Sequence, residues 1–227
     1  MPKTVTALLA GASGLVGRAL LAQLLDDDGA AVVAVLRREV PELPRRKALR
    51  TLLVDFAHLP ALPAADELYI ALGTTIKVAG SRAAFRAVDF DAVVDLARAA
   101  QRSGIRRVAV VSALGADERA IAFYNRVKGQ AEQALRALGF ERLVVARPSL
   151  LAGERRALGQ PPRLGEQLAL SVLRPLGTLV PASVRPIDAA VVARAMRRAL
   201  HADAAPALQI LESSTLQHLG AAAPAAP

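Results

Sequence analysis

The stretch Thr4-Val-Thr-Ala-Leu-Leu-Ala-Gly11-Ala-Ser-Gly14-Leu-Val-Gly17-Arg-Ala-Leu20 joins an apolar run to a glycine-rich turn and a helical pattern. It predicts a buried strand, a turn and a helix in direct succession. In such a turn the first glycine allows the tight bend, the second lets the backbone approach a pyrophosphate, and the third lets the helix pack closely on the strand. Backbone N–H groups at the helix N-terminus bind the negative charge. The residues expected at this phosphate site are Gly11, Ser13, Gly14, Leu15, Val16 and Gly17. A strand–helix turn without a ligand is the alternative.

Beyond this stretch, short apolar runs rich in β-branched residues alternate with longer segments of helical period. This alternation predicts an α/β protein with a doubly wound parallel sheet, the Rossmann arrangement. Right-handed crossovers order the first strands as 3-2-1-4-5-6, and the ligand crevice then lies beyond the carboxyl ends of strands 1 and 4. The expected strands are residues 4–10, 31–36, 51–54, 68–72, 107–112, 142–146 and 207–211, and the expected helices are 15–26, 82–103, 120–138, 165–173 and 188–202.

Two arginines follow the second predicted strand, in Leu36-Arg37-Arg38. Enzymes that use NAD carry an acidic residue at this place, which binds the 2′-hydroxyl of the ribose. A guanidinium instead forms charge-assisted, often bidentate hydrogen bonds with a 2′-phosphate. Arg37 and Arg38 therefore favour NADP as the cofactor, with NADPH preferred over NADH. Solvated surface arginines are the alternative, and Glu39 stands next to the pair.

Two further groups follow predicted strands at the same edge of the sheet. Asp55 and Phe56 come after strand 3, and Leu72-Gly73-Thr74-Thr75 comes at the end of strand 4. Because the crevice lies at the carboxyl ends of the strands, both groups are expected to contact the nucleotide. Asp55 as a simple loop cap is the competing interpretation.

Three residues form a candidate catalytic group. Strand 5 ends in Ser112, and Tyr124 and Lys128 follow at the start of a helix. The i, i+4 spacing puts Tyr124 and Lys128 on one helical face, so both can converge with Ser112 beside a nicotinamide ring. In this arrangement Tyr124 donates the proton in carbonyl reduction, Lys128 stabilises the phenolate and orients the ribose, and Ser112 binds the substrate oxygen. The alternative is a Tyr124 that only caps the helix and a solvated Lys128.

The chain resembles the atypical short-chain dehydrogenases and reductases, and within them the Tat-interacting oxidoreductase-like group. The resemblance implies that an acidic residue at Asp55 binds the adenine amino group, that the loop after strand 4 lines the ribose and pyrophosphate, and that Arg147 and Pro148 also border the cofactor. Many extended members carry asparagines where this chain has Asp89 and Asp95. The stretches that carry the resemblance are residues 11–17, 72–75 (Leu-Gly-Thr-Thr), 84–91 (Ala-Phe-Arg-Ala-Val-Asp-Phe-Asp), 111–116 (Val-Ser-Ala-Leu-Gly-Ala), 124–129 (Tyr-Asn-Arg-Val-Lys-Gly) and 146–149 (Ala-Arg-Pro-Ser).

Composition excludes several other classes of protein. Without cysteine the chain has no disulfide, thiolate metal site or cysteine nucleophile. Its three histidines are too far apart in sequence to form a helix-borne ligand pair, so we expect no metal site. The net charge of +9 comes mostly from scattered arginines, and only 3% of residues are aromatic, so nucleic-acid binding is not expected. No apolar run reaches the ~18–20 residues of a membrane span, and we expect a soluble, cytoplasmic protein.

These observations lead to one expected organisation and function. Residues 1–220 are expected to form a single NAD(P)-binding domain with a small substrate-side extension at about 150–185, and 221–227 a disordered tail. The expected function is an NADP(H)-dependent oxidoreductase of a small carbonyl or alcohol substrate, acting as a monomer or homodimer. The alternatives are an NADPH-binding regulatory or scaffold protein with little turnover, and an isomerase that holds NAD tightly. The short C-terminal region argues against a nucleotide-sugar substrate.

Overall fold

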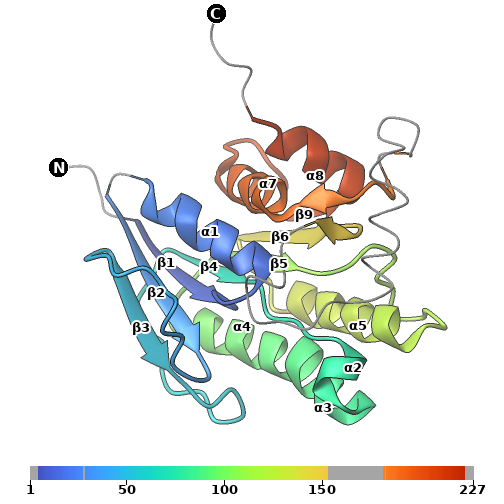
Figure 1. Ribbon diagram of the computed structural model, residues 1–227, viewed down its shortest axis with the longest axis horizontal. Helices are drawn as coiled ribbons and strands as arrows, with labels where there is room; N and C mark the ends of the chain where they lie inside the picture. The colour runs from blue at the N-terminus through green and yellow to red at the C-terminus, as the bar shows by residue number, and fades with distance from the viewer. Residues whose placement is uncertain (1–4, 28, 153–180, 182, 223–227) are drawn as a thin grey trace, which may run out of the picture.

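The computed structural model describes residues 5–27, 29–152, 181 and 183–222, and they form a parallel sheet with helices on both faces (Figure 1). The sheet has seven strands in the order β3-β2-β1-β4-β5-β6-β9, and all neighbours are parallel. This confirms the predicted doubly wound α/β fold. The strands are β1 (Val5–Ala10), β2 (Ala30–Leu36), β3 (Leu49–Leu53), β4 (Glu67–Ile70), β5 (Arg107–Val111), β6 (Arg142–Arg147) and β9 (Leu208–Glu212).

Two apolar layers hold the helices on the sheet, one on each face. On one face α1 (Leu15–Leu25), α7 (Ala189–His201) and α8 (Ser213–Gly220) pack around a core that includes Leu20, Met196 and Leu216. On the other face α4 (Ala92–Arg102) and α5 (Phe123–Ala137) pack through residues such as Leu96 and Leu135. The central strands are buried on both sides, which explains why their sequences are continuous apolar runs rather than alternating ones.

The region after β4 differs most from the sequence prediction. The helix expected at 82–103 consists of α3 (Arg82–Arg86), a π-helical turn η1 (Ala87–Asp91) and α4, and it is preceded by the short α2 (Ile76–Ala79). A π turn carries one extra residue in the helical repeat and is often found at functional sites. The spacing of apolar residues in the sequence does not reveal such an insertion, so the sequence pattern predicted one regular helix.

The C-terminal part adds elements that the sequence analysis did not predict. Helix α8 packs on α7, and β7 (Leu151–Ala152) pairs with β8 (Ile187–Asp188) in a small parallel sheet. The helix expected at 165–173, most of the extension expected at about 150–185 and residues 223–227 of the expected tail lie outside the described residues. In the described ranges, no helix combines the length and apolarity needed to cross a bilayer. The same ranges hold no cluster of three or more acidic or histidine side chains suited to a metal ion.

Candidate nucleotide site and catalytic residues

The glycine turn between β1 and α1 is built around close backbone contacts. Gly11 has a positive φ of 89°, and a Cβ on it would lie 2.4 Å from the Ala71 carbonyl oxygen after β4. A Cβ on Gly17 would lie 2.0 Å from the Gly11 oxygen, so only glycine lets α1 approach the turn this closely. These contacts match the roles predicted for the first and third glycines.

Gly14 stands at the N-cap of α1 in a more open environment. A Cβ there would meet only the Gly11 oxygen at 3.4 Å and the Ala71 oxygen at 4.0 Å. No side chain in the described part of the chain caps the helix, so the N–H groups of its first turn are left for another acceptor. An anion fits this cradle, because those N–H groups and the helix dipole both favour negative charge. Contact between Gly14 and a pyrophosphate stays a prediction.

Arg37 and Arg38 follow β2 directly, and both side chains are exposed. Within the described part of the chain neither guanidinium has a hydrogen-bond or ion-pair partner. Two guanidinium groups without a described partner thus lie at the carboxyl end of β2, the strand that pairs with β1. In NADP-binding proteins of this fold an arginine near this position accommodates the 2′-phosphate, so contact between these arginines and NADP stays a prediction.

Asp55 caps its own loop. Its Oδ1 accepts a hydrogen bond from the Ala57 amide at 2.9 Å, and its Oδ2 lies 2.9 Å from His58 Nδ1. These two hydrogen bonds, the one with His58 foremost, lower the pKa of Asp55, so it is a carboxylate at neutral pH. The capping interpretation is therefore what the structure shows, and contact with adenine stays a prediction. Phe56 and Leu72, expected at the same site, are partly buried against the core on the α4 side of the sheet.

A buried ion pair lies below the loop that follows β4. Lys128 Nζ of α5 is 2.8 Å from Asp89 Oδ1 of η1, and the two side chains are only 6% and 0% exposed. Asp89 Oδ2 accepts a hydrogen bond from the Thr74 amide at 2.9 Å. Burial alone would lower the pKa of Lys128, but the negative charge of Asp89 and the interactions with Tyr124 and Glu132 outweigh it and raise that pKa. Lys128 is therefore an ammonium ion.

Tyr124 lies on the first turn of α5, four residues before Lys128, as the spacing predicted. Its ring packs against the fully buried Phe85 of α3, with ring centroids 5.4 Å apart. Tyr124 itself is half-buried, and its electrostatic interaction with Lys128 is one of the causes that raise the lysine pKa. The structure thus brings Tyr124 and Lys128 together at the carboxyl edge of the sheet.

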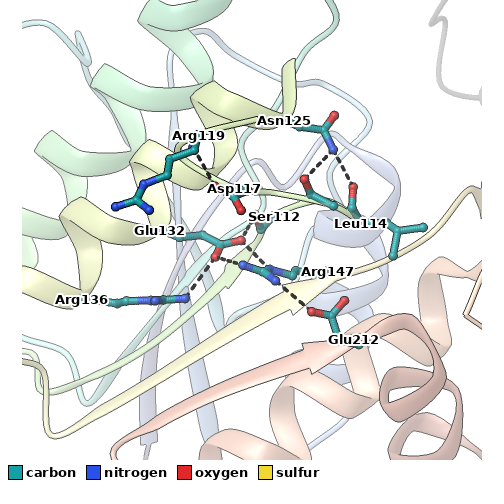
Figure 2. A network of polar contacts seen from close by, with 10 residues as sticks. Ser112, Leu114, Asp117, Arg119, Asn125, Glu132, Arg136, Arg147 and Glu212 are labelled. Carbon is teal, nitrogen blue, oxygen red and sulfur yellow. Dashed lines mark hydrogen bonds and ion pairs between the residues drawn. The ribbon is translucent and has the colours of Figure 1, made fainter. Parts of the chain in front are cut away.

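Ser112 belongs to a different polar network (Figure 2). Its hydroxyl donates to Glu132 Oε1 of α5 at 2.5 Å, and Arg147 donates to the two oxygens of Glu132 from Nε at 3.0 Å and Nη2 at 2.7 Å. Arg147 Nη1 donates to Glu212 at the end of β9 at 2.9 Å. The hydrogen bonds with Glu132 raise the pKa of Arg147 above its already high usual value. Arg147 thus joins β6, α5 and β9.

This network changes what is expected of two predicted site residues. Because the single proton of Ser112 is given to Glu132, Ser112 would have to release that bond before donating to a substrate oxygen. Three nitrogens of Arg147 already donate hydrogen bonds to carboxylates within the protein. Glu132 was missed by the sequence analysis, although it stands four residues after Lys128 on the same helical face and is buried.

The loop after β5 is tied to both neighbouring elements. Asn125 Nδ2 of α5 donates to the carbonyl oxygens of Leu114 and Gly115 at 3.0 and 2.7 Å, and the Leu114 amide donates to the Pro148 oxygen at 3.0 Å. A Cβ on Gly129 would lie 2.1 Å from the Asp117 carbonyl carbon, so α5 touches this loop through glycine. The loop that follows Ser112 is therefore fixed relative to the first turn of α5, which carries Tyr124.

The fold and this edge of the sheet define a Rossmann-type dinucleotide-binding domain. Residues 11–167 match a protein family described as NAD(P)H-binding, and the chain belongs to that family. Relatives include "Protein fmp52, mitochondrial" of Emericella nidulans, 33% identical over 156 residues that cover 65% of this chain and 67% of the relative. "Protein FMP52, mitochondrial" of Eremothecium gossypii is 37% identical over 153 residues, covering 66% and 68%.

Solved structures with this fold include complexes with nucleotide sugars and NAD. MoeE5 in complex with UDP-glucose and NAD superposes with a TM-score of 0.68 at 20% identity, over 92% of this chain and 76% of that one. UDP-glucuronic acid 4-epimerase from Bacillus cereus, in complex with UDP-glucuronic acid and NAD, gives a TM-score of 0.70 at 14% identity, over 91% and 76%. At these identities the likeness establishes the fold alone.

The names of the fungal relatives contradict the cytoplasmic location expected from the sequence, because these proteins are called mitochondrial. The expectation is therefore wrong. Its physical basis was weak, since the lack of an apolar span separates soluble from membrane-spanning chains but does not distinguish one aqueous compartment from another.

Proposed function

We propose that this protein is an NADP(H)-dependent oxidoreductase that reduces a small carbonyl compound or oxidises the corresponding alcohol. The observation that carries the proposal is the placement of Tyr124 beside a charged, buried Lys128 at the carboxyl edge of a dinucleotide-binding sheet. The order of the motifs also supports a place among the atypical short-chain dehydrogenases and reductases, in the Tat-interacting oxidoreductase-like group.

The cradle at Gly11, Gly14 and Gly17 fits a pyrophosphate, and Arg37 and Arg38, which have no partner among the described residues, fit a 2′-phosphate. Both features support NADP over NAD as the cofactor. Bound there, the cofactor would supply or accept a hydride at its nicotinamide ring. The loop from Gly73 to Thr75 and the ammonium of Lys128 would then face its ribose.

Tyr124 serves as the proton donor to the substrate oxygen in this proposal. A phenol transfers its proton poorly at neutral pH unless positive charge stabilises the phenolate, and Lys128 supplies that charge one helical turn away. Hydrogen bonding of the substrate oxygen by Ser112 requires that the hydroxyl turn away from Glu132.

The test is NADPH oxidation, followed by absorbance, with a panel of aldehydes, ketones and quinones. Tyr124→Phe keeps the ring against Phe85 but removes the proton, so turnover should fall about 10²- to 10⁴-fold while NADPH affinity changes little. Unchanged turnover in Tyr124→Phe would remove this residue from the mechanism.

A regulatory NADPH-binding protein with little turnover is the second candidate. The hydrogen bond from Ser112 to Glu132 favours it, because the hydroxyl expected to bind the substrate oxygen is occupied within the fold. Tight NADPH binding together with no turnover of any carbonyl in the panel would support this function over the first.

A further inference from the structure

Asp89 occupies a position that no catalytic or binding role has so far explained. It is fully buried in the π-helical turn η1, where a carboxylate is costly unless it is paired. Its two oxygens contact two different parts of the site, with Oδ1 at the Lys128 ammonium and Oδ2 at the Thr74 amide. The carboxylate therefore links α5 to the loop that follows β4.

The backbone of this loop passes close to the ion pair. A Cβ on Gly73 would lie 3.4 Å from Asp89 Oδ1 and 3.7 Å from Lys128 Nζ. Glycine at this position thus keeps any side chain away from the pair. Since Gly73 is exposed, the ammonium is separated from the surface of the site by little more than the backbone of one residue.

We propose that Asp89 is a positioning residue, which holds the Lys128 ammonium charged and in place for the nucleotide ribose and ties it to the loop at Thr74. The inference rests on the proposed function, in which Lys128 binds the nucleotide. An ammonium has three N–H donors, and pairing with one carboxylate oxygen leaves others for ribose hydroxyls and Tyr124.

The charge of Lys128 depends on its neighbours because burial opposes it. The groups that act on it are Asp89 from η1 and Tyr124 and Glu132 from its own helix, and of these the Asp89 carboxylate is the one in direct contact. With Asp89 replaced by a neutral side chain, burial becomes the dominant influence and the pKa of Lys128 falls. A neutral amine then faces the nucleotide at alkaline pH, where the native protein still presents an ammonium.

The titration of Lys128 can be followed directly by NMR of protein labelled with ¹³C at the lysine ε-carbon. The chain has only four lysines, so Lys128→Arg assigns the signal. In Asp89→Asn we expect the Lys128 midpoint to fall below those of the exposed lysines. Asp95→Asn is the matched control, because Asp95 pairs with Arg98 on the surface of α4 and should leave the titration unchanged. An unchanged Lys128 midpoint in Asp89→Asn would overturn the proposal.

NADPH affinity, measured by calorimetry, tests the link to the site. Asp89→Asn and Lys128→Met should each weaken binding about ten-fold or more at pH 9, and the double variant should be no weaker than Lys128→Met alone. If Lys128→Met weakens binding and Asp89→Asn does not, this inference is wrong and the proposed function stands. If Lys128→Met binds NADPH normally, the role of Lys128 in the proposed function fails as well.

Asp89→Asn leaves a buried ammonium without its partner and could prevent folding. In that case Asp89→Asn/Lys128→Met removes both charges, and it should fold if Asp89 acts through Lys128. Failure of this double variant to fold, when Lys128→Met alone folds, would show that Asp89 serves only the backbone at Thr74 and would overturn the proposal.

Discussion

Gly14 and Gly17 stand three residues apart in the same turn, but the space beside them differs. A Cβ fits beside Gly14 at contacts of 3.4 Å and more, whereas at Gly17 it would overlap the Gly11 oxygen at 2.0 Å. One glycine is therefore available for a ligand, and the other is required by the fold.

Gly14→Val should abolish NADPH binding while changing the free energy of unfolding little, because its side chain extends where the pyrophosphate is expected. Gly17→Ala should instead destabilise the protein by ~1–3 kcal/mol, since the turn must shift. Calorimetric binding and urea unfolding of both variants separate the two effects. Normal NADPH affinity in Gly14→Val would rule out a phosphate site at this turn.

At the scale of single residues, the sequence predicted where polar groups lie better than which partners they have. Tyr124 and Lys128 are neighbours because helical geometry requires it. The pairing of Lys128 with Asp89, and of Ser112 with Glu132, joins residues 39 and 20 positions apart in the chain. Such pairings depend on how η1 and α5 pack in the fold, and a local sequence pattern carries no information on that packing.

At the scale of elements, Arg147 joins three of them. Its guanidinium contacts Glu132 of α5, with a side chain 3% exposed, and Glu212 of β9, 46% exposed. Glu132 is the partner that depends most on Arg147, because its other cation, Arg136, is partly exposed and its Nη2 lies 3.5 Å from Glu132 Oε2, and a buried carboxylate that loses its nearest cation is strongly unfavourable. Glu212 can be solvated instead.

Arg147→Met should destabilise the protein by ~3–5 kcal/mol, and Arg147→Met/Glu132→Met should recover most of this loss. Urea unfolding of the single and double variants measures the coupling. Arg98→Ala is the control, because it breaks an exposed pair with Asp95 and should cost less than ~1 kcal/mol. A double variant no more stable than Arg147→Met would mean that the loss does not come from an unpaired Glu132.

The elements themselves were largely predictable. The strand bounds agree with the apolar runs to within two residues at each end, and the central strands, which are buried on both faces, leave the strongest signal in the sequence. The π turn, α2 and α8 were missed, since short or irregular helices lack the repeated apolar spacing on which such a prediction depends.

At the scale of the whole molecule, strand order decides where the chemistry lies. Because all seven strands are parallel, the glycine turn, Arg37, the Gly73 loop and Ser112 all follow strands at one edge of the sheet. The order places β1 between β2 and β4, so the turn, the arginine pair and the β4 loop come from adjacent strands. A dinucleotide is long enough to contact all three.

The central claim is that NADP is the cofactor and that Arg37 and Arg38 bind its 2′-phosphate. The affinities of NADPH and NADH, measured by calorimetry on the native protein and on Arg37→Ala/Arg38→Ala, test this assignment most directly. Loss of a charged contact to the 2′-phosphate is worth ~1.5–3 kcal/mol, or about ten- to a hundred-fold in affinity. We predict that the native protein binds NADPH more tightly than NADH by this factor and that the double variant binds both equally. Equal affinities of the native protein for the two nucleotides would contradict the assignment.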